Sequence, residues 1–141
     1  MIQFFSSFGW RARGLRKRRA WLEGCVQERG QQIEDISVVF MLDEELLEMN
    51  RRHLNHDEYT DIITFDMRER IPADALKGEL YISVDRVKEN ARLNGHGMDE
   101  ELDRVMVHGL LHMLGFKDKT AGERAAMRAE EDRCLEGRVR G

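Results

Sequence analysis

The sequence contains few cysteines, which can cross-link a fold, and few prolines, which bend the backbone. It contains two cysteines, Cys25 and Cys134, and a single proline, Pro72. Two cysteines that lie far apart and form no CxxC pair argue against a disulfide framework and against a thiolate zinc site. No apolar run approaches the ~20 residues of a membrane span, and the apolar run at the N-terminus is too short for a signal peptide. We therefore expect a protein of the reducing cytoplasm that has no membrane partner.

A marked excess of charge of either sign is also missing. The formal net charge is −4, from 23 basic and 27 acidic side chains, and this balance alone does not indicate a nucleic-acid-binding protein. The basic side chains are nevertheless clustered, because residues 11–19 hold six of them. A basic face that binds phosphates and an ordinary solvated helix face explain this segment equally well.

Hydrophobic periodicity predicts strands and helices both early and late in the chain. We expect strands at 2–5, 33–42, 60–65 and 78–84, and helices at 14–29, 44–52, 85–94, 99–114 and 121–135. Asp43 and Asp99 are the predicted N-caps of the helices that follow them. The pattern indicates an α+β fold with about five helices packed on one small mixed sheet of about four strands. Residues 1–141 should form a single domain.

Three residues near the end of the 99–114 helix can ligate one metal ion. His108 and His112 are four residues apart, so a helix places both imidazoles on one side, about 6 Å apart along its axis. Gly115 is a natural C-cap that lets the chain leave the helix in a left-handed conformation and turn back. Asp118 can then reach the same ion. Two histidines and one carboxylate with an open position are typical of a catalytic metal site, and we expect this helix in a cleft.

Gly109 separates this pattern from the HExxH metalloproteases. Those enzymes carry a glutamate general base directly after the first histidine, and glycine cannot deprotonate a water molecule. We interpret Gly109 as open backbone beside the first ligand, where a substrate could approach.

The metal segment also resembles a known family. His108-Gly-Leu-Leu-His-Met-Leu-Gly-Phe116 is similar to the metal motif of the YbeY family of metal-dependent endoribonucleases of bacterial rRNA maturation. The segments 60–65 (Thr-Asp-Ile-Ile-Thr-Phe) and 78–83 (Gly-Glu-Leu-Tyr-Ile-Ser) resemble the family's central strands, and the likeness extends over about residues 38–135.

The resemblance implies a single-strand-acting endoribonuclease that matures the 3′ end of 16S rRNA and takes part in ribosome quality control. It implies one divalent metal ion, with Zn²⁺ favoured, held by His108, His112 and Asp118. The expected partners are rRNA and the small ribosomal subunit, and the chain is expected to act as a monomer. Arg16, Arg18 and Arg19 of the basic segment are the candidate RNA contacts, and no residue is assigned as the catalytic base.

Two positions depart from the pattern that the resemblance implies. The family's usual third ligand is a histidine, whereas the aligned residue here is Asp118, preceded by Lys117 in place of the common aspartate. A carboxylate can still ligate zinc. Leu54 falls where the family commonly carries an arginine, so this chain must supply that positive charge from another residue or act without it.

Two other classes of protein stay open on the residues alone. Two histidines and one carboxylate also form the iron site of non-haem oxygenases, although those enzymes are usually all-β barrels. A non-enzymatic rRNA-binding module with a structural metal would carry the same ligands. Retained RNA binding after chelation would favour the module, and metal-dependent cleavage would favour the nuclease.

Overall fold

The computed structural model describes residues 1–138, so the last three residues of the predicted domain 1–141 lie outside it. Its strands are β1 (Ile2–Ser6), β2 (Ile33–Met41), β3 (Ile62–Asp66) and β4 (Leu76–Ser83), and its helices are α1 (Leu15–Glu28), α2 (Asp43–Leu54), α3 (Val84–Asn94), α4 (Met98–Met113) and α5 (Ala121–Glu136). None of the helices within residues 1–138 has the length and apolar character needed to cross a bilayer.

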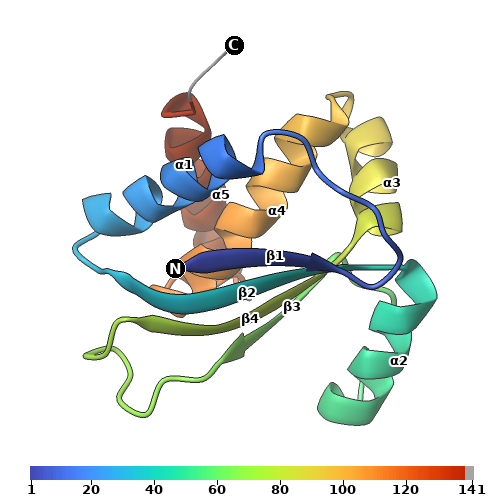
Figure 1. Ribbon diagram of the computed structural model, residues 1–141, viewed down its shortest axis with the longest axis horizontal. Coiled ribbons are helices and arrows are strands. Elements are labelled where there is room, and N and C mark those ends of the chain that lie inside the picture. The colour runs from blue at the N-terminus through green and yellow to red at the C-terminus, as the bar shows by residue number, and fades with distance from the viewer. Residues whose placement is uncertain (139–141) are drawn as a thin grey trace.

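The strands form one sheet in the order β1-β2-β4-β3. β1, β2 and β4 run parallel, and β3 pairs with β4 in the antiparallel direction. Residues in a strand alternate between two faces, and Val38 and Phe40 of β2 lie beside Leu80 and Ile82 of β4 on one buried face. α1, α3, α4 and α5 lie on one side of the sheet and α2 on the other (Figure 1). The predicted α+β fold with a small mixed sheet is confirmed.

Helix α4 is the central helix of the core. From Glu101 to Met113 every residue is buried except His108 and His112, which are partly exposed. Most of these buried residues are apolar, and a helix buried on nearly all sides belongs inside a protein. The two histidines are the residues of this segment that reach the surface. The packing of α4 therefore presents both imidazoles to solvent on a rigid support.

Gly109 is the residue that lets α4 approach the sheet. A Cβ atom placed on it would lie 2.8 Å from Ile62 Cδ1 and 3.0 Å from Leu80 Cδ2, and contacts this short force neighbours to move. The prediction that Gly109 is open backbone for a substrate is therefore wrong. Its backbone faces β3 and β4, and a side chain there would have to displace the ends of Ile62 and Leu80.

Two predicted N-caps are also wrong. α2 begins at Asp43 itself and α4 begins one residue before Asp99, so both acids lie inside the first helical turn. The Asp43 carboxylate instead accepts hydrogen bonds from Ser83 Oγ (3.0 Å) and Arg86 Nη2 (2.9 Å). Asp99 forms an ion pair with Arg18 at 2.8 Å. Both carboxylates have tertiary partners, which local propensity does not reveal.

Candidate metal centre

The structure brings the three predicted ligands together. His112 Nε2 lies 3.1 Å from His108 Nε2 and 3.1 Å from Asp118 Oδ2, and His108 Nε2 lies 3.3 Å from the same carboxylate oxygen. The histidines are four residues apart on α4, and the turn after α4 returns Asp118 to them. Gly115 adopts φ +101° in this turn, a left-handed conformation that glycine accepts without strain.

These separations fit a single metal ion. Zinc–ligand bonds of roughly 2.0–2.2 Å in tetrahedral geometry place neighbouring ligand atoms about 3.3–3.6 Å apart, close to the 3.1–3.3 Å between the three atoms here. Two imidazole nitrogens and a carboxylate oxygen are ligand atoms that zinc prefers, so the donor set suits a cation between them. The group is the one such cluster of histidine, cysteine, aspartate or glutamate side chains within residues 1–138.

The ligand side chains remain accessible from solvent. Their exposed fractions are 25% for His108, 32% for His112 and 37% for Asp118. A structural zinc site is usually closed by four protein ligands, whereas a catalytic site keeps one position for water or substrate. Three accessible ligands therefore favour the catalytic kind of site.

Glu131 of α5 supports the first histidine from behind. Its Oε2 lies 2.6 Å from His108 Nδ1, and its Oε1 accepts a hydrogen bond from Arg104 Nη1 at 3.0 Å. A carboxylate at Nδ1 keeps the proton on that nitrogen, which leaves the Nε2 lone pair for a metal. Arg104 also pairs with Asp132 at 2.9 Å, so its charge is shared between two carboxylates.

The charge around His108 outweighs its burial. Burial alone would lower the pKa of His108, but the hydrogen bond and charge of Glu131, with Asp61 and Asp118, raise the pKa above its ordinary value of 6.5. The sequence pattern did not predict Glu131, because α5 carries many acids and nothing in their spacing marks the one that reaches α4.

Arg68 fixes the end of the helix that carries the ligands. Its side chain is 1% exposed and pairs with Asp66 at 2.5 Å, while its Nη2 donates to the carbonyl oxygen of Met113 at 2.5 Å. The last carbonyls of a helix lack partners within the helix, and here a guanidinium supplies one. The turn to Asp118 therefore begins from an anchored residue. Sequence reasoning missed Arg68 as well.

Two clefts meet at the three ligands. The first, which we call the β3 cleft, has a volume of about 730 Å³ and runs along β3 past Leu54, Thr64 and Lys119. The second, the helical cleft, has a volume of about 400 Å³ and is lined by residues of α3, α4 and α5. Both are also lined by His108, Asp118 and Asp61, so they form a continuous path across the site.

Asp61 has a chemical setting that sequence reasoning did not find. Its backbone carbonyl oxygen accepts a hydrogen bond from Ser83 N at 2.9 Å, whereas its side chain lines both clefts. Burial raises the pKa of Asp61, and the charge of His108 opposes that rise. A carboxylate whose pKa moves towards neutrality is suited to accept a proton from a substrate or a water molecule.

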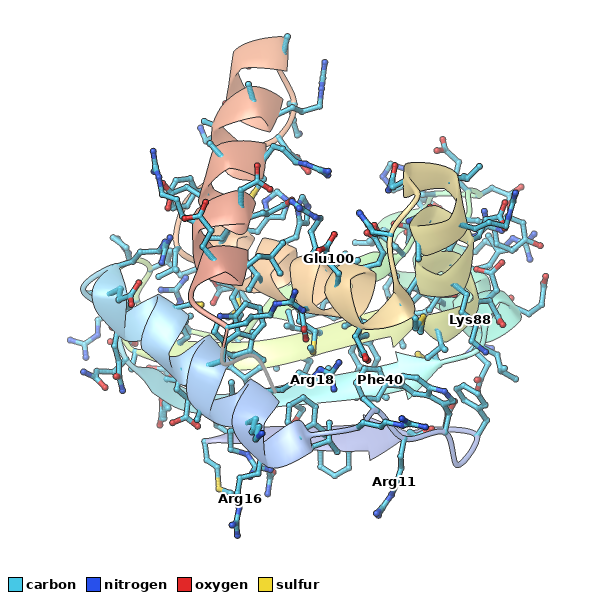
Figure 2. All side chains as sticks on the ribbon, turned by 90° about the horizontal axis from the view of Figure 1, so that it is seen from above. Arg11, Arg16, Arg18, Phe40, Lys88 and Glu100 are labelled. Atoms are coloured by element: carbon cyan, nitrogen blue, oxygen red, sulfur yellow. The ribbon has the colours of Figure 1, made fainter. Side chains whose placement is uncertain are left out.

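The predicted RNA contacts lie elsewhere on the molecule. Arg18 is committed to Asp103 and Asp99 of α4, both at 2.8 Å, and Arg19 Nε donates to the Ile2 carbonyl oxygen at 2.7 Å. Arg16 is exposed and points outward beyond β1, away from α3 and α5 (Figure 2). The structure thus places none of the three arginines at the clefts.

Fold and site together define an α+β protein with an accessible group of two histidines and one carboxylate that could hold a metal ion. Residues 14–138 match the model of the family described as Endoribonuclease YbeY. The chain belongs to that family.

Relatives with this name are similar to the chain over most of their length. An Endoribonuclease YbeY of Cytophaga hutchinsonii is 47% identical over 124 residues, which cover 86% of this chain and 85% of the relative. One from Christiangramia forsetii is 43% identical over 131 residues, covering 93% and 90%. The solution structure of TM1509 from Thermotoga maritima shares the fold, with a TM-score of 0.66 and 24% identity, over 96% of this chain and 87% of that one.

Proposed function

We propose that this protein is a metal-dependent endoribonuclease that cleaves single-stranded rRNA precursors, at the 3′ end of 16S rRNA, within a single domain. The observation that carries the proposal is the group of three ligand atoms, 3.1–3.3 Å apart, open to two clefts in a chain of the Endoribonuclease YbeY family. We further propose Zn²⁺ as the ion, the small ribosomal subunit as the partner, a monomeric state and a cytoplasmic location.

The residues of the site divide the work of phosphodiester cleavage. His108, His112 and Asp118 would hold the ion, which when bound supplies charge for a phosphoryl oxygen and lowers the pKa of water. Glu131 keeps His108 in the tautomer that presents Nε2. Asp61 lies at the junction of the clefts, where its carboxylate can take the proton of the attacking hydroxyl. Lys119 offers a cation at the rim of the β3 cleft.

The test is cleavage of a purified rRNA precursor by three samples: metal-loaded protein, chelated protein and loaded His112→Ala. We expect defined cleavage by the first sample alone. Tight RNA binding by all three without cleavage would instead support a non-enzymatic rRNA-binding module, and oxygen consumption by the iron-loaded protein would support an oxygenase. Asp118→His, which restores the ligand implied by the resemblance, should retain the metal, whereas Asp118→Ala should lower bound metal per chain in elemental analysis.

A further inference from the structure

We propose that the helical cleft is a subsite for one nucleotide of the RNA strand, beside the phosphodiester that lies at the metal site. This inference rests on the proposed function and goes beyond it by naming the residues that hold the neighbouring nucleotide. The cleft volume of about 400 Å³ falls within the roughly 300–1,000 Å³ of ligand pockets. Because the cleft shares His108 and Asp118 with the β3 cleft, a strand across the ligands reaches both.

One wall of the helical cleft carries two arginines that form no ion pair within residues 1–138. Arg124 and Arg128 lie four residues apart on α5, and therefore on one side of that helix. Arg128 forms no ion pair within residues 1–138, and the Arg124 side chain donates only to the carbonyl oxygen of Lys119, at 2.7 Å. Arg104, the third arginine of the cleft, is instead paired with two carboxylates. Two guanidinium groups that have no acidic partner among the described residues, beside the proposed nuclease site, suit phosphate oxygens.

The opposite wall carries amide groups with unused hydrogen-bonding capacity. Asn90 and Asn94 lie four residues apart on α3, and α3 and α5 rise on either side of α4 (Figure 2). Asn90 Nδ2 has one contact, to Asp61 at 3.5 Å, and Asn94 Nδ2 has one, to Glu101 at 3.3 Å. Each amide keeps its carbonyl oxygen and a second N–H. Such pairs of donor and acceptor match the Watson–Crick edge of an unpaired base.

The floor of the cleft favours a base rather than another anionic ligand. Val105 and Met127 contribute apolar surface, against which a flat ring can lie. Glu101, which is 4% exposed, is an acceptor that would repel a second phosphate and attract an exocyclic amino group. A cationic rim, paired amides and an acidic, partly apolar floor together fit a nucleotide. They also predict a preference for adenine or cytosine over uracil, which lacks the amino group.

The test measures binding of fluorescein-labelled single-stranded RNA by chelated protein, so that cleavage plays no part. Arg124→Ala/Arg128→Ala should raise Kd by at least about tenfold and reduce the salt slope by roughly 1.4, since each lost phosphate contact on a single strand contributes about 0.7. Arg92→Ala/Arg133→Ala is the control, because it removes equal charge from exposed arginines of α3 and α5 that pair with acids on their own helices. The control should bind like wild type.

Base preference is tested with oligo(A), oligo(C) and oligo(U). Wild type should bind oligo(A) or oligo(C) several-fold more tightly than oligo(U), and Asn90→Ala/Asn94→Ala should remove this difference. The subsite would be overturned, and the proposed nuclease left intact, if the arginine variant bound RNA like wild type and the asparagine variant kept the base preference. An equal loss of RNA affinity in the control variant would also overturn the subsite. If wild-type protein neither binds nor cleaves RNA, the proposed function fails. Far-UV circular dichroism of each variant verifies that it is folded.

Discussion

Replacing Glu131 with glutamine should weaken metal binding although all three ligand side chains stay in place. The two carboxylate oxygens of Glu131 serve different groups, one the His108 imidazole and the other the Arg104 guanidinium. A glutamine has one oxygen and one NH₂ group, so it can accept from only one of these donors. If its NH₂ faces His108, it favours the tautomer with the proton on Nε2, the atom that must bind the metal.

The expected loss of affinity follows from the position of Glu131. Its side chain is 6% exposed and lies 2.6 Å from His108 Nδ1, so water cannot replace the lost acceptor well. Removing a carboxylate that supports a ligating histidine typically lowers metal affinity by about 10–100-fold. This range corresponds to roughly 1.4–2.7 kcal/mol of binding free energy.

The assay is a competition titration of Zn²⁺ between the protein and a chromophoric chelator at pH 7.5. Asp132→Asn is the matched control: it removes the other carboxylate that pairs with Arg104, next to Glu131 in the chain, but leaves His108 untouched. The control should change affinity by less than about threefold, because the Asp132 side chain is 53% exposed and solvent screens it. Wild-type affinity in Glu131→Gln, or an equal loss in Asp132→Asn, would refute the reasoning.

Three further predictions follow from the packing and charges. Gly109→Ala should lower the unfolding free energy by about 1–3 kcal/mol in denaturant titrations, because the new Cβ presses on Ile62 and Leu80. Gly122→Ala on α5 is the control, since nothing lies within 4 Å of its new Cβ, and it should not destabilise the protein. An equal loss of stability in the two variants would contradict this account. Asp66→Asn should cost roughly 3 kcal/mol at neutral pH, because buried Arg68 loses its carboxylate. The hydrogen bond from Arg68 lowers the pKa of Asp66 below 3.8, so this stabilisation is complete above about pH 3.8 and is lost as the pH falls through the lowered pKa. A wild-type-to-variant difference that stays constant as the pH is lowered below 3.8 would argue against it. Zinc affinity should fall as the pH drops through the raised pKa of His108, because protons compete for Nε2. The pH at which half of the affinity is lost should be lower in Glu131→Gln, and an unchanged value would exclude Glu131 as the group that raises the pKa of His108.

Local sequence signals were sufficient for the fold class and for the grouping of His108, His112 and Asp118. The alternation in 33–42 and 78–84 and the spacing of His108 and His112 depend on periods of two and 3.6 residues, which neighbouring residues alone determine. Gly115 was predicted for the same reason, because a left-handed turn after a helix is a local event. The helical spacing places the two histidines together, and the turn at Gly115 brings Asp118 to them.

Contacts between distant segments could not be read in the same way. Glu131 lies 23 positions from His108, and Arg68 lies 45 positions from Met113, so no periodicity connects them. Gly109 was misinterpreted because the sequence does not show which side of α4 faces the sheet. Likewise, Arg18 looked like a free cation until the structure placed Asp103 against it.

Helix α5 belongs to the metal site and to the proposed nucleotide subsite at once, through Glu131 and, three residues earlier, Arg128. An ion held by His108 would also restrain Glu131, which lies 2.6 Å from His108 Nδ1, and with it the helix that carries the arginines. We therefore expect metal and RNA to bind cooperatively, and thermodynamic linkage makes this reciprocal: RNA must raise metal affinity by the factor by which metal raises RNA affinity. The protein would then hold its ion most tightly while RNA occupies the cleft, and exchange it most readily between substrates.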